Sequence, residues 1–329
     1  MKKIVTFGEA LMRLSPPNYQ RFLQARNFDI NYGGAEANVA LALANLGYDS
    51  YFVTKVPDNA LGHAAIDSIR QFGVNTNYVV YGGEKLGLYF LETGSSVRAS
   101  KVIYDRKNSA ISSAKSDEFN WDEIFIGKDM FLVTGITPAI SDNLAQITEE
   151  ALKKAKNKNI EIVLDVNYRA KMWSLKKADQ VMSKLLPYAD IVIGFAPDIL
   201  LEIDQNLDPD EHINLLKRMV EKYDLKIAAS TFRTSQSANH NSLKAKLYDG
   251  KNLYTSKEYE FDIVDRVGGG DSFTTGLMSG ILDEKPLQEV LEFATATSVW
   301  KHTIPGDANI VTKEEIESLA KGGSTLVQR

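Results

Sequence analysis

Residues 130–229 alternate between short apolar runs typical of buried strands and longer amphipathic runs typical of helices. We expect strands at residues 131–133, 160–166, 191–193 and 227–229, with helices at residues 142–157, 178–186 and 210–222 between them. Strands that are connected through helices pair in parallel, and the helices then cover both faces of the sheet. The chain is therefore predicted to be an α/β protein with three layers and a mostly parallel central sheet.

The first part of the chain follows the same alternation and then departs from it. We expect two strands and two helices here, at residues 3–7, 51–55, 35–46 and 61–72. Three more strand-like runs, at residues 79–81, 86–92 and 102–106, have no helical pattern between them, so they predict a local antiparallel patch. No internal repeat or low-complexity linker divides the sequence, so we predict a single domain over residues 1–329.

Composition limits the classes of function that fit the chain. Its 329 residues are 44% hydrophobic, and a chain of this size buries roughly three quarters of its unfolded surface. It has no cysteines, and its four histidines are scattered, so we expect neither a disulfide framework nor a protein-bound metal. A net charge of −5 argues against nucleic acid or an anionic membrane as a partner. No apolar signal region or membrane-length run occurs, so we expect a cytoplasmic protein.

Three consecutive glycines and an aspartate, from Gly268 to Asp271, separate a predicted strand at residues 258–264 from a predicted helix. The helix is indicated by Phe273, Leu277 and Ile281, which fall on one face. A glycine turn before a helix presents unpaired backbone N–H groups and the positive end of the helix dipole, which favour anions. Asp271 can simply cap this helix. Phosphoryl transfer gives a second reason for the carboxylate, because it can take the proton of an attacking hydroxyl.

Several polar turns follow predicted strands. Ligands of open α/β sheets bind beyond the carboxyl ends of the strands, so we expect these turns to gather at one edge of the sheet. They are Gly33-Gly34, Asn167-Tyr168-Arg169, Thr231-Phe232-Arg233 and the turn from Gly268 to Asp271.

Two motifs at this separation resemble the ribokinase-like (PfkB) sugar kinases over essentially the whole chain. They are Gly33-Gly34-Ala35-Glu36-Ala37-Asn38-Val39-Ala40 and residues 265–276. Leu164-Asp165-Val166-Asn167-Tyr168-Arg169 and Tyr104-Asp105-Arg106 are similar to the branch of the family that acts on keto-deoxy sugar acids. The resemblance implies a ribokinase-like three-layer α/β/α fold with a small antiparallel β lid, formed by residues from about 9–32 and 85–107. It also implies ATP-dependent phosphorylation of the terminal (6-) hydroxyl of 2-keto-3-deoxygluconate.

The resemblance assigns roles to individual residues. Asp271 is the implied general base, and Gly268, Gly269 and Gly270 are the implied anion hole for the transferred phosphate. The implied substrate contacts are Gly33, Gly34, Asn38, Tyr89, Tyr104, Arg106, Arg169 and Asp271. The implied ATP contacts are Asn167, Arg169, Thr231, Arg233, Gly268 and Gly270. Mg²⁺ would arrive with ATP, and some relatives bind a monovalent cation at a position like Asp265.

The residues themselves leave simpler alternatives open. Tyr89 and Tyr104 can be packing residues on a sheet face, and Asn38 can be a polar residue on a helix surface. Arg106 and Arg169 can be solvated surface arginines, although a neutral sugar would not require either of them. Exposed lid edges also favour a homo-oligomer, because unpaired strand edges invite pairing.

The sequence departs from the family pattern in three places. Val267 and Gly269 stand where family members often have Thr and Ala, and neither side chain would perform the chemistry. Residues 230–239 lack the glycine-rich run that usually precedes the nucleotide turn. Thr295 stands where an Asn is common near the adenine, so the nucleotide contacts are the least defined part of the prediction.

Other classes of function fit less well. No G-x-x-x-x-G-K-[ST] motif of a P-loop kinase and no G-x-G-x-x-G motif of a nicotinamide enzyme occurs where it would be needed. A fructokinase, a ribokinase or a kinase of another keto-deoxy sugar acid remains an alternative. A non-catalytic sugar-acid-binding protein is disfavoured, because a pure binder needs neither Asp271 nor an anion hole.

Overall fold

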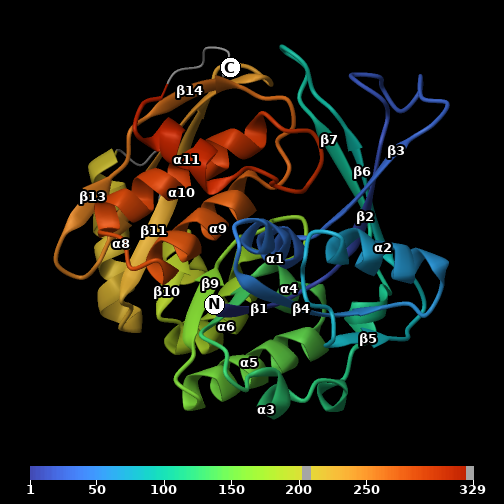
Figure 1. The fold of residues 1–329 in the computed structure, drawn as a ribbon, viewed down its shortest axis with the longest axis horizontal. Helices are drawn as coiled ribbons and strands as arrows, with labels where there is room; N and C mark the ends of the chain where they lie inside the picture. The colour runs from blue at the N-terminus through green and yellow to red at the C-terminus, as the bar shows by residue number, and fades with distance from the viewer. Residues whose placement is uncertain (202–208, 324–329) are drawn as a thin grey trace.

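The protein is a three-layer α/β/α structure with a small second sheet at one side (Figure 1). The structure is a computed structural model, and it describes residues 1–201 and 209–323. Within these residues the central sheet has the strand order β13-β12-β11-β10-β9-β8-β1-β4-β5, and β14 also pairs with β12. The strands are β1 (Lys3–Phe7), β4 (Asp49–Val56), β5 (Val79–Tyr81), β8 (Met130–Thr134), β9 (Glu161–Asp165), β10 (Ile191–Ile193), β11 (Ile227–Ser235), β12 (His240–Tyr248), β13 (Leu253–Thr255) and β14 (Tyr259–Asp262).

The central sheet is parallel from β5 to β11 and antiparallel beyond it. This arrangement confirms the predicted three-layer fold with a mostly parallel sheet. The predicted helix at residues 142–157 is α5 (Asp142–Asn157), and the predicted strands at residues 131–133 and 191–193 lie within β8 and β10.

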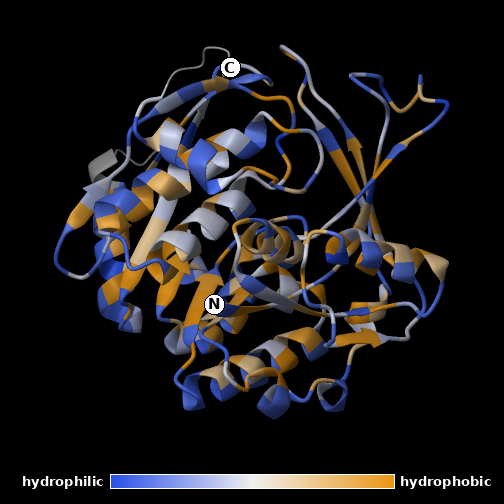
Figure 2. Cartoon of the chain, viewed as in Figure 1, coloured by the Kyte–Doolittle hydropathy of each residue, from blue (hydrophilic) through white to orange (hydrophobic). Residues whose placement is uncertain are grey.

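Helices cover both faces of this sheet because successive residues of the parallel strands are apolar on both sides. Leu132 belongs to the core that includes α9 and α10, whereas its neighbour Val133 belongs to the core that includes α5 and α6. Hydrophobic residues accordingly run along the central strands, while the outer faces of the helices are polar (Figure 2).

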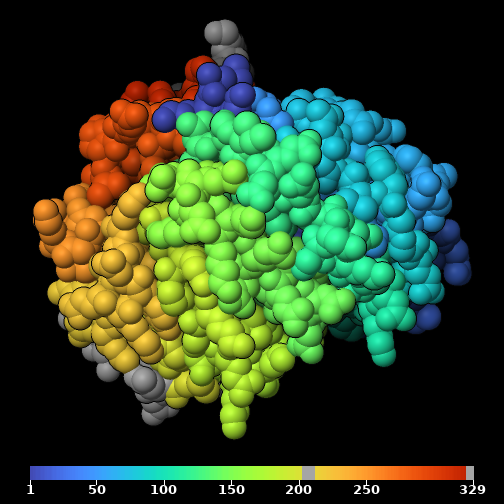
Figure 3. Space-filling model, turned by 90° about the horizontal axis from the view of Figure 1, so that it is seen from below, coloured from blue at the N-terminus to red at the C-terminus, as the bar shows by residue number. Residues whose placement is uncertain are grey.

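The helices divide into two layers. One face carries α1 (Ala35–Asn45), α2 (Ala60–Arg70), α9 (Gly269–Leu282), α10 (Leu287–His302) and α11 (Lys313–Ala320). The other face carries α3 (Trp121–Ile124), α5, α6 (Leu175–Leu185) and α8 (Pro209–Tyr223), and the view from below shows part of this layer (Figure 3). Two short helices, α4 (Ile136–Ile140) and α7 (Pro197–Leu201), follow β8 and β10. None of the helices in the described residues is long and apolar enough to cross a membrane.

The second sheet, here called the lid, has the strand order β3-β2-β6-β7. Its strands are β2 (Leu11–Ser15), β3 (Asp29–Gly33), β6 (Gly87–Glu92) and β7 (Lys101–Asp105). The β3–β2 and β6–β7 pairs are antiparallel, as predicted, and a parallel β2–β6 pair joins them. The prediction was wrong for residues 79–81, which form β5 and pair in parallel with β4 at the edge of the central sheet.

The lid has two different faces because side chains alternate along each strand. Arg13, Tyr89 and Tyr104 are cross-strand neighbours on the face toward the central sheet. Leu14, Ile30, Phe90 and Ile103 form the matching cross-strand row on the opposite face.

One predicted turn is a strand in the structure. Thr231 and Arg233 lie within β11, which continues to Ser235 because β12 pairs with it along its whole outer half. Neither β12 nor β13 was expected from the sequence.

Candidate active site

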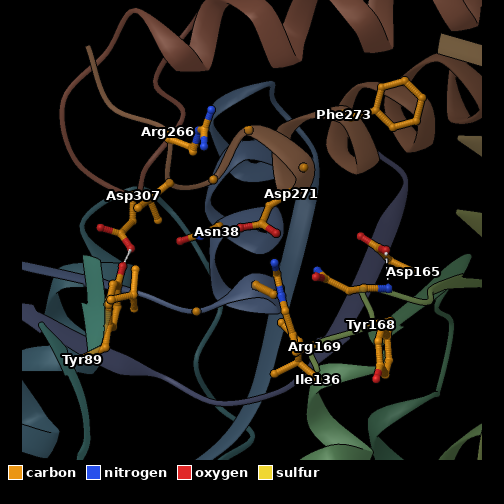
Figure 4. A pocket seen from close by; sticks show the side chains of 18 of the residues that line it. Asn38, Tyr89, Ile136, Asp165, Tyr168, Arg169, Arg266, Asp271, Phe273 and Asp307 are labelled. Atoms are coloured by element: carbon orange, nitrogen blue, oxygen red, sulfur yellow. Dashed lines mark hydrogen bonds between the residues drawn. The ribbon is translucent and has the colours of Figure 1, made fainter. Parts of the chain in front are cut away.

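A cavity of about 830 Å³ lies between the lid and the carboxyl ends of the central strands (Figure 4). Its wall includes residues from β6 and β7 of the lid, the turn after β9, the outer half of β11 and the glycine turn before α9. The tip of the β6–β7 hairpin closes one side, since Ser96 O accepts a hydrogen bond from Ala238 N at 2.8 Å. Ser96 N donates in return to Asn239 Oδ1 at 2.6 Å. Two segments far apart in the sequence are thereby held together over the cavity.

The glycine turn forms the N-terminus of α9 as predicted from the sequence. Gly268 is the N-cap residue, with φ 82°, a left-handed conformation that glycine adopts without strain. A Cβ atom at Gly268 would also lie 2.6 Å from Asp307 O. No side chain caps this helix end, so its first backbone N–H groups are available to an anion in the cavity.

The N-terminus of α1 meets the same cavity. Its N-cap residue is Gly34, with φ 141°, where a Cβ atom would lie 2.0 Å from Glu9 O. One turn later, buried Asn38 donates a hydrogen bond to Asp271 Oδ2 at 2.7 Å. The two helix N-termini that carry the sequence motifs are thus joined through the candidate base.

Three carboxyl groups lie near one another beneath the cavity, and burial disfavours their charged forms. Burial, together with the charge of Asp165, raises the pKa of Asp271 to about 7, although the hydrogen bond from Asn38 lowers it. Burial likewise raises the pKa of Asp165 to about 6, although Thr274 and Asn167 donate hydrogen bonds to it. Glu36 is buried with a raised pKa and accepts hydrogen bonds from Thr134 and Thr137.

The turn after β9 carries Arg169 over this group of acids. Asn167 opens the turn with φ 39°, in the left-handed region that asparagine tolerates better than most residues. The exposed side chain of Arg169 points toward Asp271 (Figure 4). It forms no hydrogen bond or ion pair within residues 1–201 and 209–323, and its charge opposes the raised pKa values of Asp271 and Asp165.

The other predicted substrate residues already have partners. Arg106 forms an ion pair with Glu9, and its guanidinium carbon lies 5.8 Å from the centre of the Tyr104 ring. The Tyr89 hydroxyl donates to Asp307, and its ring centre lies 5.9 Å from that of Tyr104. The two tyrosines therefore contribute ring surface to the lid wall of the cavity.

A buried histidine holds Arg233 at the wall of the cavity. His302 Nδ1 donates to Ser298 O at 2.6 Å, which leaves Nε2 to accept from Arg233 Nη2 at 2.7 Å. Burial and the nearby Arg233 charge lower the pKa of His302 to about 3, so the ring is neutral. A Cβ atom at Gly269 would lie 2.3 Å from His302 Cε1. This close approach explains why residue 269 is glycine, although the family motif that the sequence resembles often has alanine at this position.

The structure brings most of the predicted site residues to the cavity wall. Those that line it are Gly34, Asn38, Tyr89, Tyr104, Arg106, Asn167, Arg169, Thr231, Arg233, Gly268, Gly269, Gly270 and Asp271. Gly33 does not line it, because this residue faces the side chain of Asp307, which itself forms part of the wall. Thr295 is also outside it, buried within α10, where its hydroxyl donates to Leu291 O.

Sequence reasoning missed several charged residues of the wall. They are Glu9, Glu36, Asp165, Lys171, Arg266 and Asp307. Glu9 and Asp165 stand at or just after the carboxyl ends of β1 and β9, so the strand-end rule could have found both. Asp307 follows α10 in a turn without such a signal. Among the described residues, no three His, Asp or Glu side chains are grouped as metal ligands.

Comparison with known proteins gives one consistent result. A family model described as pfkB family carbohydrate kinase matches residues 1–314. The 2-dehydro-3-deoxygalactonokinase of Haloferax volcanii is 32% identical over 331 residues, which is 99% of either chain. A crystal structure of 2-dehydro-3-deoxygluconokinase from Thermotoga maritima has a TM-score of 0.95 and 45% identity, and covers 98% of this chain and 100% of that one. The fold is shared by an E. coli structure described as ribokinase II in complex with ATP and Mg²⁺. That structure has a TM-score of 0.82 and 20% identity, and the match covers 98% of this chain and 100% of that one.

The raised pKa of Asp271 predicts that this residue costs stability at neutral pH and above. Its folded pKa of about 7 exceeds its ordinary value of 3.8, so stability is lost as pH rises from about 4 to about 7. Asp271→Asn removes this loss of stability, because the introduced amide does not ionise. The amide oxygen of the new side chain can still accept the hydrogen bond from Asn38. We expect thermal unfolding of the variant at a higher temperature than wild type near pH 8, with a gap that narrows as pH falls toward 4.

Asp122→Asn is the matched control, since Asp122 is an exposed residue of α3 whose pKa is lowered by a hydrogen bond from Lys154. This control is expected to gain no stability at any pH. An Asp271→Asn variant that unfolds no later than wild type near pH 8 would contradict the assigned environment of Asp271.

Proposed function

The chain belongs to the pfkB family of carbohydrate kinases, and we propose that it transfers the γ-phosphoryl group of ATP to the terminal 6-hydroxyl of 2-keto-3-deoxygluconate. This compound is the 2-dehydro-3-deoxygluconate named for the Thermotoga relative. The Haloferax relative is named for the galactonate epimer, so a kinase for that epimer is the second candidate. Both names refer to keto-deoxy sugar acids, which supports an acidic rather than a neutral sugar.

The observation that carries the proposal is the position of Asp271 between two free helix N-termini. A carboxylate that must accept a proton near neutral pH works best with a pKa close to the working pH, and burial raises the pKa of Asp271 to about 7. The backbone N–H groups after Gly268 lie beside it and can hold the phosphate oxygens.

The proposed reaction is a direct in-line transfer. The sugar hydroxyl oxygen bonds to the γ-phosphorus of ATP, its proton passes to the Asp271 carboxylate, and the bond from the γ-phosphorus to the bridging oxygen breaks, which releases ADP. Mg²⁺ enters as part of the ATP complex and offsets phosphate charge. The lid and the Ser96–Asn239 contact would limit water in the cavity and so limit hydrolysis of ATP.

Arg169 is the residue best placed to meet the charge of an acidic substrate. Its guanidinium has no partner among the described residues, whereas Arg106 is paired with Glu9. Arginine binds carboxylates in bidentate fashion, and a charged hydrogen bond contributes about 1.5–3 kcal/mol. Thr231 and Arg233 line the same cavity, and together with Asn167 and the glycine turn they are the residues proposed to hold the nucleotide.

The experiment that tests the function is ADP release from Mg-ATP with four substrates: 2-keto-3-deoxygluconate, its galactonate epimer, fructose and ribose. We expect turnover with the keto-deoxy acids only. Preference for fructose or ribose would contradict the acidic substrate, and binding of a sugar acid without ADP release would contradict the kinase assignment.

The role of Asp271 predicts a pH profile and a variant phenotype. Since the ionised carboxylate is the base, kcat/KM is expected to rise through about pH 7 and then level off. Asp271→Asn is expected to keep substrate binding and to lower kcat roughly 10²–10⁴-fold. Asp122→Asn serves as the control with unchanged kinetics. Wild-type turnover in Asp271→Asn would remove this residue from the proton transfer.

The role of Arg169 predicts a selective loss of acidic substrate. Arg169→Ala is expected to raise KM for 2-keto-3-deoxygluconate by one to two decades, at about 1.4 kcal/mol per decade. KM for ATP is measured in the same variant, because Arg169 also faces the predicted nucleotide side. An equal loss with a neutral sugar would show that no substrate carboxylate is bound by Arg169.

We also propose that the protein forms a homo-oligomer through the lid. The outer row of the lid leaves Ile30 56% and Ile103 55% exposed, an apolar surface that a second copy could cover. Light scattering is expected to give a multiple of the 36.6 kDa chain mass. Ile103→Lys is expected to shift the protein toward monomer, whereas Ile126→Lys, an exposed change after α3, is not. A monomeric wild type would contradict the proposal.

A further inference from the structure

Asp265 is the position at which the resemblance to the PfkB family would place a monovalent cation, but neither of its carboxylate oxygens is free for one in this chain. Its Oδ1 accepts from Arg13 Nη1 at 3.3 Å and from Val267 N at 3.0 Å. Its Oδ2 accepts from Arg13 Nη2 at 2.8 Å and from Gly306 N at 2.9 Å. Alkali cations are held by oxygen ligands that replace their water shell, whereas here four N–H donors surround the carboxylate.

Arg13 is a fixed part of this arrangement. Its side chain is 3% exposed, and its Nε lies 3.2 Å from Asp307 Oδ2. Burial alone would lower its pKa, but the charges of Asp307 and Asp265 raise it, so the guanidinium stays charged. Arg13 comes from β2 of the lid and therefore ties the lid to the start of the glycine turn.

A second cation lies directly beneath the glycine turn. Lys301 on α10 is fully buried, and its Cε would lie 3.3 Å from a Cβ atom at Gly268. Its ammonium donates to Ile304 O at 2.9 Å, so it occupies a carbonyl oxygen that a cation could otherwise bind. Burial lowers the pKa of Lys301, while the charges of Asp265, Asp307 and Asp271 oppose that shift.

The local charges balance without an added ion. Arg13 and Lys301 supply two positive charges, and the carboxyl groups of Asp265 and Asp307 face them, all four on largely buried side chains. Burial raises the pKa of Asp307, while the Arg13 charge opposes that shift and favours its carboxylate form. A further cation would add an unpaired charge to a buried group, which is costly. The residues present therefore do not fit a bound monovalent cation.

We propose that this kinase works without a monovalent cation, and that the Lys301 ammonium, supported by Arg13, provides the positive charge behind the anion hole. The proposal rests on the kinase function proposed above. A fixed charge beneath Gly268 adds to the positive end of α9 and stabilises negative charge that develops on the transferred phosphate. Lys301 acts through the glycine turn and is a positioning residue.

The first test compares wild-type rates in media of equal ionic strength. One medium has tetramethylammonium and Mg²⁺ as its only added cations, and the others contain K⁺, Na⁺ or NH₄⁺ in place of tetramethylammonium. We expect the same kcat in all of them. Severalfold activation by any small cation would overturn the inference and leave the kinase function intact.

Two variants of Lys301 separate its charge from its volume. Lys301→Met keeps a long stem without charge, and we expect kcat to fall about tenfold or more in every medium with little change in KM for the sugar acid. Lys301→Ala removes the side chain, which leaves room for an ion and frees the carbonyl oxygen of Ile304. K⁺ or NH₄⁺ is therefore expected to restore part of the kcat of this variant. A lysine with only a structural role would not give that response. Lys55→Met removes another buried lysine, the partner of Glu118 far from the glycine turn, and is expected to keep wild-type kcat. Wild-type kcat in Lys301→Met would overturn the role of this charge.

A crystallographic test does not depend on activity. Crystals of the wild-type protein grown in thallium(I) are expected to show no anomalous peak beside the Asp265 carboxylate. A peak there would overturn the inference even for a protein that turns over none of the sugars. Loss of turnover in every medium, with no such peak, would contradict the kinase function alone.

Discussion

The hydrogen bond from Asn38 to Asp271 is the contact on which the candidate site depends. It joins residues 233 positions apart and holds the N-terminus of α1 against that of α9. Each helix begins at a glycine whose backbone geometry excludes a side chain, so each leaves its first N–H groups toward the cavity. Anion binding and proton acceptance can therefore occur at adjacent positions, which a single helix N-terminus would not provide.

Charge is distributed unevenly around this contact. Glu36, Asp165 and Asp271 are enclosed by protein and by one another, which raises their pKa values, and Arg169 stands over them without a partner among the described residues. Behind the glycine turn the enclosed groups are cations instead, because Arg13 and Lys301 are fixed among carboxylates. A substrate that brings phosphate and carboxylate groups would thus meet positive charge both above and behind the base.

The fold was largely predictable because hydrophobic periodicity is a local property of the sequence. The alternation after residue 130 correctly predicted the parallel sheet, and α5 has the predicted bounds. Residues 79–81 were assigned to the wrong sheet, since a strand of three residues carries no information about its partner. The ribbon of β12 and β13 was missed because Asn, Ser and Lys in residues 240–248 weaken the strand pattern, although Leu243, Ala245 and Leu247 alternate inward.

The sequence by itself determined where glycine, aspartate and arginine stand relative to strand ends, and this was enough to predict the glycine turn and the edge of the sheet that bears the site. Tertiary structure alone decided the partners of the charged groups. Arg106 faces Glu9 across 97 residues, Arg13 faces Asp265 across 252, and Lys301 lies beneath Gly268. The physical reason is that secondary structure depends on neighbours along the chain, whereas pKa values and ion pairs depend on which distant side chains share a buried space.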